Sequence, residues 1–352
     1  MEFGMEFIPS STINIMRKEV GFVVIGCGRI GKRHIEMIKA TEGAKLLATC
    51  DVKSIKELGI SEDCDHYLDT EFLFKDVEGI EVAAIATPNG LHAEHALVSI
   101  KYGAHPIIEK PMSLRSLDAE NVLHEALQKG RFVFGVMQNR YSPPSKWLKE
   151  IISSDKLGNI YMVHVDCFWN RDDRYYRSGD WHGSKKLDGG TLFTQFSHFI
   201  DILYWVFGDI HPTHVDIHNF NHKESIDFED SGMVHFDLAK GGKGSLNYST
   251  SVWDSNLESS LTVIGENGSI KIAGQYMNEV VHCNIKNYTM PTLEASNPPN
   301  NYGAYKGSAA NHIYVYENVM SVLAGSSPIT TNALEGLKVV DIIERIYKLS
   351  EN

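Results

Sequence analysis

The sequence has 352 residues, of which 43% are hydrophobic and 22% charged, and its formal net charge is −12. This composition is typical of a globular protein, and the length is comfortable for two domains. Because no dense run of Lys or Arg offsets the negative charge, the sequence argues against nucleic acid or an anionic membrane as a partner. No apolar run approaches the roughly 20 residues that cross a bilayer, so we expect no membrane span.

Residues 1–16 lack the basic segment followed by an apolar segment that marks a signal peptide, and we expect them to form a flexible extension. The five cysteines are odd in number and show no C-x-x-C spacing. They fit a reduced, cytoplasmic location and predict neither a disulfide framework nor a zinc site. The sequence contains no H-E-x-x-H or comparable ligand set, so we expect no metal.

The stretch that organises the chain follows its first predicted strand, Val20–Ile25, and has the spacing Gly26-x-Gly28-x-x-Gly31. We expect Gly26 to make a tight turn, Gly28 to let the backbone approach a pyrophosphate, and Gly31 to let the next helix pack close to the strand. The N-terminus of that helix would direct its N–H groups at phosphate. Taken alone, such a fingerprint is equally typical of an ordinary glycine-rich turn.

Asp51 provides the context that favours dinucleotide binding. It follows the second apolar run, Ala44–Thr49, and lies 20 residues after Gly31, the spacing at which a carboxylate meets the adenosine ribose hydroxyls. A carboxylate there would repel a 2′-phosphate, so NAD is favoured over NADP. Lys53 and Ser54 follow closely and keep NADP as the alternative.

Strand-like runs alternate with helical patterns across residues 17–141, which indicates a parallel, doubly wound sheet in an α/β domain. The predicted strands are Val20–Ile25, Lys45–Cys50, Val82–Ala86, Pro106–Ile108 and Phe132–Val136, and the predicted helices are Ile30–Ala40, Leu91–Lys101 and Ser116–Gln128. Ligands bind at the carboxyl ends of the strands in such a sheet. Thr87-Pro88-Asn89 and Glu109-Lys110-Pro111 both fall at such ends.

The pattern changes after Tyr141, and we expect a second α/β domain over residues 142–352. Its predicted helices are Ser145–Ile152, Thr191–Val206, Asn311–Leu323 and Ala333–Leu349, and its predicted strands are Ile160–Trp169, His214–Asn219, Gly232–Leu238, Gly244–Ser251, Ser259–Ile264 and Ser269–Ile272. The alternating strands predict a large, mainly antiparallel sheet. Asn297–Ser308, rich in Asn, Pro, Gly and Tyr, is predicted to be a loop.

Lys110 ends an apolar run at a strand end that faces the expected cofactor crevice. A partly desolvated lysine beside an oxidised nicotinamide has a lowered pKa, which suits it to take a proton from an alcohol as hydride leaves. A surface lysine that ends a strand is an equally good explanation of this position.

Thr194, His198 and Asp201 are spaced at i, i+4 and i+7, so the predicted helix would bring them to one face. A histidine on that face can shuttle a substrate proton or orient a reacting hydroxyl. Because His198 stands between Phe196 and Phe199, a histidine buried in the core is the alternative interpretation.

The loop between Trp169 and Gly183 is dense in arginine and aromatic side chains, among them Arg171, Tyr176 and Trp181. Planar guanidinium groups suit carboxylate or phosphate, and aromatic faces suit sugar rings or bases. A solvated loop that contacts another subunit is the alternative.

Several of these motifs together resemble the Gfo/Idh/MocA oxidoreductases. The likeness is carried by Gly26-Cys27-Gly28-Arg29-Ile30-Gly31, Thr87-Pro88-Asn89 with His92, Glu109-Lys110-Pro111, and Gly189-Gly190 followed by His198 and Asp201. The resemblance covers nearly the whole chain from Arg17 onward. It implies an N-terminal NAD-binding Rossmann domain and a C-terminal α/β domain whose open sheet is often used for homodimer or homotetramer contacts.

The resemblance also implies roles for individual residues. Lys110 would be the catalytic lysine, assisted by His198. The cofactor-binding residues would be Gly26, Gly28, Arg29, Ile30, Gly31, Asp51, Thr87, Asn89, His92, Glu109, Lys110 and Gln138. The substrate-binding residues would be Arg171, Tyr176, Trp181, Thr194, Gln195 and His198.

Within this family the chain is most similar to the bacterial UDP-N-acetylglucosaminuronate 3-dehydrogenases of surface-polysaccharide synthesis. The matching runs are Gln138-Asn139-Arg140-Tyr141 with Pro143-Pro144, Trp169-x-Arg171 with Tyr175-Tyr176, Trp181-x-Gly183, Leu187-Asp188-Gly189-Gly190, and Gln195. The chain departs from the pattern at Thr191, where glycine is usual, at Thr194, where Asn or Asp is usual, and at Phe196, where glycine is usual. A bulky Phe196 near the histidine could reshape the pocket.

The expected activity is therefore NAD-dependent oxidation of a secondary hydroxyl on a sugar, at C3 of a UDP-linked N-acetylhexuronic acid. The alternatives are another sugar or cyclic polyol dehydrogenase of the family, acting for example on inositol or UDP-GlcNAc, a reductase running in the opposite direction, and a non-catalytic NAD-binding regulator. The presence of both Lys110 and His198 argues against the regulator, because a protein that only binds has no need of a base.

Overall fold

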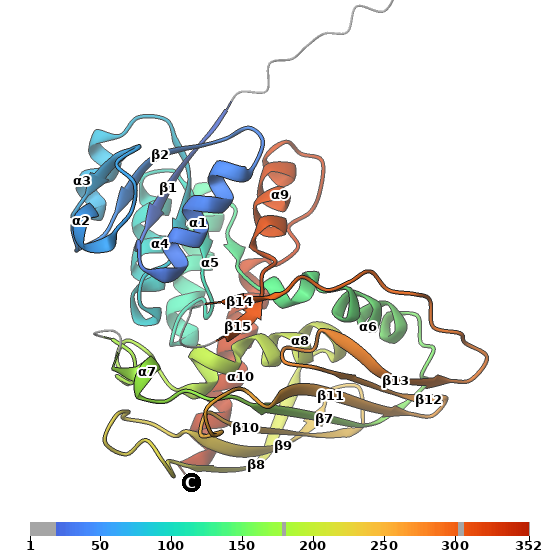
Figure 1. The fold of residues 1–352 in the computed structure, drawn as a ribbon. Helices are drawn as coiled ribbons and strands as arrows, with labels where there is room; N and C mark the ends of the chain where they lie inside the picture. The colour runs from blue at the N-terminus through green and yellow to red at the C-terminus, as the bar shows by residue number, and fades with distance from the viewer. Residues whose placement is uncertain (1–18, 178–180, 302–305, 352) are drawn as a thin grey trace, which may run out of the picture.

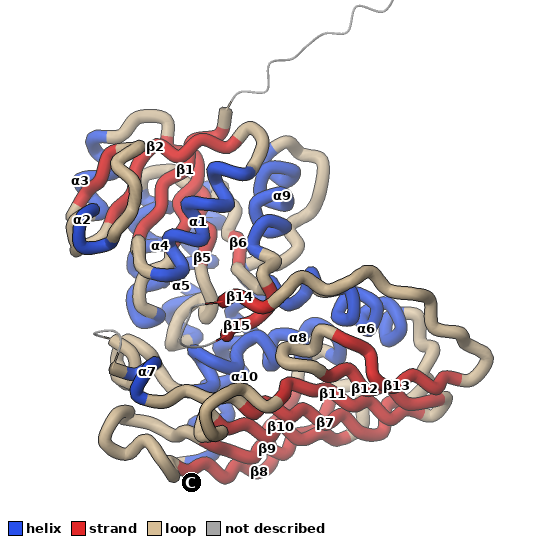
Figure 2. The backbone as a smooth tube through the Cα atoms, in the orientation of Figure 1, coloured by secondary structure: helices blue, strands red, loops and turns tan. Residues whose placement is uncertain are grey.

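The computed structural model describes residues 19–177, 181–301 and 306–351, which form two large sheets, a small two-stranded sheet and the helices around them (Figures 1 and 2). The extension expected over residues 1–16 lies outside the described residues. The polypeptide builds one sheet from its N-terminal part and the larger sheet from the part after residue 142.

The N-terminal part forms a six-stranded parallel sheet with the order β3-β2-β1-β4-β5-β6. Its strands are β1 (Val20–Ile25), β2 (Ala44–Cys50), β3 (Asp65–Tyr67), β4 (Ile80–Ile85), β5 (His105–Ile108) and β6 (Phe134–Gly135). The predicted doubly wound sheet is confirmed. The sequence pattern does not predict β3, because its three residues are partly exposed and form no apolar run.

Helices cover both faces of this sheet. They are α1 (Arg29–Ala40), α2 (Ile55–Leu58), α3 (Thr70–Asp76), α4 (His92–Lys101) and α5 (Ser116–Lys129), with a 3₁₀ turn at Asn89–Leu91. The short helices α2 and α3, absent from the prediction, begin at capping side chains, because Ser54 accepts from the Glu57 amide and Asp69 accepts from the Phe72 amide.

The second sheet has seven strands in the order β13-β12-β11-β7-β10-β9-β8. They are β7 (Ile160–Phe168), β8 (Ile210–His218), β9 (Ser231–Leu238), β10 (Lys243–Ser249), β11 (Glu258–Gly265), β12 (Gly268–Ala273) and β13 (Glu279–Ile285). Only β7 and β10 pair in parallel, so the mainly antiparallel prediction is confirmed. The face away from the helices exposes Met162, Met233 and Ile264.

The other face of this sheet lies under helices (Figure 1). The remaining helices are α6 (Pro143–Ser153), α7 (Asp173–Tyr176), α8 (Ser197–Phe207), α9 (His312–Leu323) and α10 (Ala333–Ser350), with a 3₁₀ turn at Gln138–Tyr141. The helix predicted from Thr191 is not a regular α-helix, because Leu192–Phe196 forms a π-helix before α8 begins. The predicted loop at Asn297–Ser308 contains paired strands β14 (Pro299–Asn301) and β15 (Lys306–Ala309).

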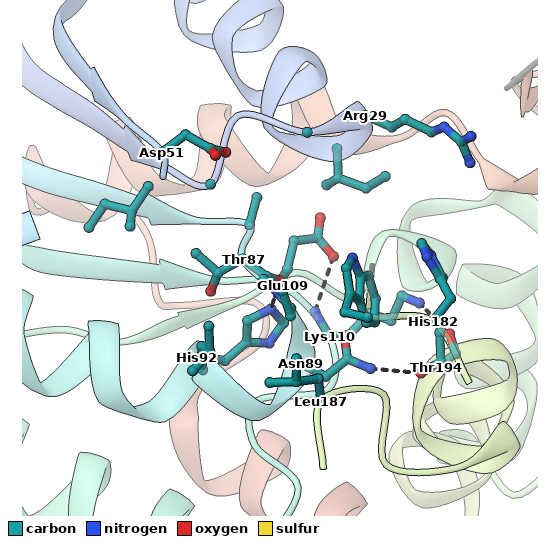
Figure 3. A pocket seen from close by; sticks show the side chains of 18 of the residues that line it. Arg29, Asp51, Thr87, Asn89, His92, Glu109, Lys110, His182, Leu187 and Thr194 are labelled. Atoms are coloured by element: carbon teal, nitrogen blue, oxygen red, sulfur yellow. Dashed lines mark hydrogen bonds between the residues drawn. The ribbon is translucent and has the colours of Figure 1, made fainter. Parts of the chain in front are cut away.

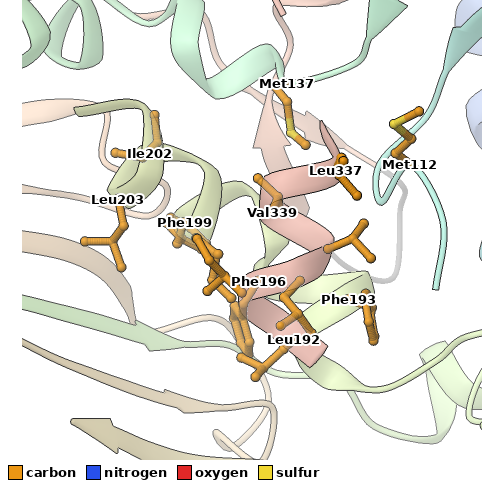
Figure 4. Packing of buried hydrophobic residues seen from close by; sticks show 14 of the residues in the cluster. Met112, Met137, Leu192, Phe193, Phe196, Phe199, Ile202, Leu203, Leu337 and Val339 are labelled. Carbon is orange, nitrogen blue, oxygen red and sulfur yellow. The ribbon is translucent and has the colours of Figure 1, made fainter. Parts of the chain in front are cut away.

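The two parts of the chain share buried cores. Helix α9, far along the chain, returns to the first sheet, where Tyr316 and Val319 are buried in one cluster with Phe22 and Val24 of β1. Helix α10 packs against α5 and α8. Figure 4 shows this second core, in which Leu337 and Val339 of α10 lie beside Phe196 and Phe199, and Met112 and Met137 join from the N-terminal part. This packing sets how the two sheets are placed across the site between them.

Candidate active site

A cavity of about 530 Å³ lies between the carboxyl ends of the parallel strands and the second part of the chain (Figure 3). The expected site residues that line it are Gly26, Gly28, Arg29, Ile30, Asp51, Thr87, Asn89, His92, Glu109, Lys110, Gln138, Arg171, Trp181, Thr194, Gln195 and His198. Two expected site residues, Gly31 and Tyr176, are not among the lining residues. The structure therefore brings residues from both parts of the chain to one cavity.

The glycine-rich turn explains why Gly31 lies away from the cavity. A Cβ atom at Gly31 would collide with the carbonyl oxygen of Gly26, so this glycine permits close packing of α1 against β1. Gly26 has a φ of +85°, which the tight turn requires. A Cβ at Gly28 would meet nothing within 4 Å, so the backbone there faces open space.

Asp51 lies at the end of β2 on the same rim. Its Oδ2 accepts a hydrogen bond from the Cys27 amide at 2.7 Å, and its Oδ1 accepts one from the Lys53 amide at 2.9 Å. The carboxylate is thus held beside the glycine-rich turn, where it lines the cavity. An open backbone turn at a helix N-terminus with an oriented carboxylate beside it fits NAD, which Gly26, Gly28 and Asp51 would hold.

Lys110 connects the two parts of the chain. Its Nζ donates a hydrogen bond to the carbonyl oxygen of Thr194 at 2.6 Å. Burial lowers the pKa of Lys110 below its ordinary value, and Arg171 lowers it further, while Glu109 and Asp188 oppose this shift. A lysine with a lowered pKa can serve as a proton acceptor.

Glu109 precedes Lys110 and is held by two histidines. Its Oε1 lies 3.1 Å from Nε2 of His34 and 3.3 Å from Nε2 of His312, and its Oε2 accepts from the Lys110 amide at 3.1 Å. Burial alone would raise the pKa of Glu109, but His312 and His34 hold it well below its usual range. The second nitrogen of His34 lies 2.6 Å from the Tyr316 hydroxyl, so α9 supports this carboxylate.

His92 and Asn89 fix the strand ends that carry this chemistry. The ring nitrogens of His92 lie 2.7 Å from the carbonyl oxygen of Pro111 and 2.8 Å from that of Thr87. Asn89 donates to the Thr194 hydroxyl at 2.7 Å, a contact drawn in Figure 3. The ends of β4 and β5 are therefore tied to each other and to the second part of the chain.

His198 lies on α8 and lines the cavity, although it is only 2% exposed. Burial, strengthened by the charge of Lys110, holds its pKa well below the usual value, so the imidazole is neutral. Asp201, expected on the same helix face, does not reach the cavity. Its carboxylate forms a buried two-point ion pair with Arg140, with distances of 2.5 and 2.8 Å.

Arg171 lines the cavity, although it is only 2% exposed. Its Nε donates to Oε1 of Gln195 at 2.7 Å, and Nε2 of Gln195 donates to the Tyr175 hydroxyl at 2.8 Å. Tyr175, rather than the expected Tyr176, lines the cavity. Tyr176 does not line the cavity; its ring packs edge-on against Tyr175 at 5.1 Å, and both tyrosines belong to one buried cluster with Ile226.

His182 is a lining residue that the sequence analysis does not single out. Its ring stacks on Trp181 with centroids 4.1 Å apart and meets the Tyr175 ring edge-on at 4.5 Å. Burial, with the charges of Arg29 and Arg171, lowers the pKa of His182 to about 4. Together these rings form an aromatic wall suited to the face of a sugar or base.

Further lining residues come from the second part of the chain, and all of them except Trp169 lie in segments without a recognisable motif. They are Trp169, Asn300, Gly307, Ser308 and His312. Asn300 and Ser308 belong to the β14–β15 pair, and His312 begins α9. The aromatic side chains around Trp169 indicate a binding site in the sequence, but no motif or spacing distinguishes the other four residues.

Within the described ranges, no group of three or more His, Cys, Asp or Glu side chains is arranged to hold a metal ion. No helix among the described residues is long and apolar enough to cross a membrane. The five cysteines are free thiols.

A parallel sheet with a glycine-rich turn, an oriented Asp51 and a partly buried Lys110 on the same cavity defines an NAD-dependent oxidoreductase. Residues 20–136 match the oxidoreductase family with the NAD-binding Rossmann fold, and residues 146–271 match the Gfo/Idh/MocA C-terminal domain. The chain belongs to the Gfo/Idh/MocA family.

Two solved structures resemble the whole chain. The WlbA dehydrogenase from Bordetella pertussis in complex with NADH and UDP-GlcNAcA has a TM-score of 0.84 and 27% identity, covering 95% of this chain and 97% of that one. The WlbA dehydrogenase from Chromobacterium violaceum with the same ligands has a TM-score of 0.81 and 28% identity, covering 99% and 97%. An uncharacterised oxidoreductase from Synechocystis is 26% identical over 272 residues, or 74% of this chain and 73% of that protein.

Proposed function

We propose that this protein oxidises the C3 hydroxyl of a UDP-linked N-acetylhexuronic acid, with NAD as the hydride acceptor, in the synthesis of a surface polysaccharide. The observation that carries the proposal is the meeting of Lys110 and His198, from two parts of the chain, in a single cavity that also reaches the glycine-rich turn. The WlbA complexes with NADH and UDP-GlcNAcA, at 27% and 28% identity, support the substrate class.

The residues around Lys110 suit it to act as the general base. NAD, when bound, supplies the acceptor for the hydride that leaves the alcohol carbon. The neutral amine of Lys110, favoured by burial, takes the hydroxyl proton at Nζ. The Thr194 carbonyl then holds the resulting ammonium group through the 2.6 Å hydrogen bond.

His198 assists by orienting the hydroxyl. A neutral imidazole carries one N–H donor and one acceptor nitrogen, so it can bind the reacting hydroxyl without adding a second positive charge beside Lys110. The aromatic wall of Tyr175, Trp181 and His182 would receive the apolar faces of the substrate and keep water from the reacting carbon.

The test is a substrate screen with NADH absorbance as the readout. UDP-N-acetylhexuronates, UDP-GlcNAc and free polyols such as inositol are supplied with NAD to the purified protein and to Lys110→Met. We expect NADH only with the UDP-hexuronates, formed by the unmutated protein and far more slowly by Lys110→Met. Lys243→Met, which removes an exposed lysine paired with Asp237, is the matched control. Turnover of inositol alone would contradict the proposed substrate, and near-normal turnover by Lys110→Met would contradict the role of Lys110 as the base.

We also propose that the protein works in the cytoplasm as a homodimer or homotetramer. The five free thiols support a reducing compartment. The bare sheet face with Met162, Met233 and Ile264 supports contact with another copy. Sedimentation analysis would give the subunit number, and a monomer at micromolar concentration would contradict the assembly.

A further inference from the structure

Asp188 is a buried carboxyl group that the proposed chemistry does not use directly. It is 1% exposed and does not belong to the lining of the cavity. Its Oδ1 is bonded to the Thr194 hydroxyl, and its Oδ2 accepts a hydrogen bond from the Gly183 amide at 2.8 Å. One side chain therefore joins the segment after Trp181 and His182 to the π-helix that carries Thr194.

Thr194 connects Asp188 to two further residues, Asn89 and Lys110. Its hydroxyl accepts a hydrogen bond from Asn89 at 2.7 Å, and the same Asn89 nitrogen donates to the Asp188 carbonyl at 2.8 Å. The Thr194 carbonyl accepts from Nζ of Lys110 at 2.6 Å. Asp188, Thr194, Asn89 and Lys110 thus form one connected network between the two parts of the chain.

We propose that Asp188 is a positioning residue for Lys110: by holding the Thr194 hydroxyl and the Gly183 amide, it fixes the carbonyl that anchors the Lys110 amine and the aromatic wall beside it. The inference rests on the proposed role of Lys110 as the base. Asp188 does not line the cavity, so its effect is exerted through Thr194 and the Gly183 segment.

The charges near Lys110 predict a change in the pH dependence of the reaction that a purely structural role of Asp188 would not produce. The groups that act on Lys110 are Glu109, Arg171 and Asp188. Burial raises the pKa of Asp188 to about 6, so its carboxylate is ionised above that pH and stabilises the ammonium form of Lys110. Removing this negative charge must lower the pKa of Lys110 and shift the acid side of the pH–rate profile to lower pH.

Two substitutions of Asp188 differ in the hydrogen bonds that they preserve. In Asp188→Asn, the amide oxygen can accept from Gly183 while the amide nitrogen donates to the Thr194 hydroxyl, whose own proton then faces the backbone carbonyl of residue 188, 3.0 Å away. The geometry is kept and the charge is lost. In Asp188→Ala, both side-chain contacts are lost, and the buried Gly183 amide is left without the partner that Asp188 provides.

The first experiment compares the variants with the unmutated protein by steady-state kinetics. Asp188→Ala should lower kcat about 10- to 100-fold with a smaller change in KM. Asp188→Asn should recover most of that loss and move the acid side of the profile down by about one pH unit. Asp227→Asn is the control, since Asp227 is an exposed carboxylate that accepts from the Lys185 amide on the outside of the same segment.

The second experiment needs no substrate. The pH dependence of Lys110 acylation, read by peptide mass spectrometry, gives its apparent pKa in each variant. Asp188→Asn should lower this pKa and Asp227→Asn should not. If the unmutated protein oxidises no UDP-sugar, the proposed function fails, whereas this titration still decides the role of Asp188.

Thr194→Val provides a second route if Asp188→Ala does not fold. It removes the hydroxyl that Asp188 holds and should lower kcat, while Thr194→Ser keeps the hydroxyl and should lose less. Unchanged Lys110 titration in Asp188→Asn, or undiminished kcat in a folded Asp188→Ala or Thr194→Val protein, would overturn the proposal.

Discussion

The Nζ atom of Lys110 lies 2.6 Å from the carbonyl oxygen of Thr194, so a lysine from the parallel sheet is held by the backbone of a π-helix in the other part of the chain. This contact makes the base dependent on how the two parts pack. Lys110 and the glycine-rich turn line the same cavity (Figure 3).

The first prediction concerns Lys110 and His198. Lys110→Met should lower kcat about 100-fold or more and leave NAD affinity nearly unchanged, because the base is lost while the glycine-rich turn is intact. His198→Asn should reduce turnover less if it only orients the hydroxyl. Because both act on one proton, the double variant should be little slower than Lys110→Met. Strictly multiplicative losses in kcat would show that the two residues act independently.

The second prediction concerns cofactor choice. Asp51→Ala should weaken NAD binding about tenfold and improve NADP relative to NAD, since the carboxylate that would meet the ribose hydroxyls is gone. Titration calorimetry with both cofactors measures this. Asp63→Ala, an exposed carboxylate paired with Lys39, is the control. Equal affinity of the unmutated protein for NAD and NADP would refute the assignment.

The third prediction separates two adjacent tyrosines. Tyr175→Phe removes the hydroxyl that accepts from Gln195 at 2.8 Å, which loosens the support of Arg171. It should raise KM for an acidic sugar about three- to tenfold. Tyr176→Phe should leave KM unchanged, because Tyr176 does not line the cavity. A KM increase confined to Tyr176→Phe would reverse the assignment.

The fourth prediction separates two glycines of one motif. Gly31→Ala should lower the free energy of unfolding by about 2 kcal/mol or more, since its Cβ would collide with the Gly26 carbonyl. Gly28→Ala should keep the unmutated Tm, because its Cβ meets open space, yet bind NADH more weakly. Thermal unfolding and NADH fluorescence measure the two effects. Unimpaired NADH binding by Gly28→Ala would show that the backbone there does not approach the cofactor.

The fifth prediction concerns the pH dependence of stability. Burial raises the pKa of Glu229 to about 7, although the hydroxyls of Tyr347, at 2.7 Å, and Tyr248, at 3.2 Å, donate to its Oε1. The pKa of Glu229 is higher in the folded state than in the unfolded state, so ionisation of its carboxyl group destabilises the fold. This destabilisation is complete above about pH 7 and disappears as the pH falls toward the pKa of the unfolded state. The penalty is about 3 kcal/mol at pH 8.

Glu229→Gln should therefore unfold at a higher temperature than the unmutated protein at pH 8, with a smaller difference at pH 5. Calorimetry at both pH values measures this, with the exposed Glu224→Gln as the control. The same Tm difference at pH 5 and pH 8 would show that Glu229 does not titrate in this range.

The elements of the parallel sheet could be predicted from the sequence because their signals are local. Strand β1 has the bounds expected from its apolar run, and the spacing from Gly31 to Asp51 follows from the length of one helix and one strand. The cavity lining by Lys110 and His198 follows from motifs, since each lies at a recognisable strand end or helical spacing. Helix α3 and strand β13 could not be predicted from the sequence, because neither has a regular pattern of buried residues.

The tertiary structure alone decided which side chains meet. Tyr175 and Tyr176 are neighbours in sequence and pack in one buried cluster, yet in the fold only Tyr175 lines the cavity. His312 approaches Glu109 across some 200 residues of chain because α9 returns to the first sheet. Composition and periodicity record burial and local geometry, whereas such contacts depend on how distant elements pack, which no spacing along the chain encodes.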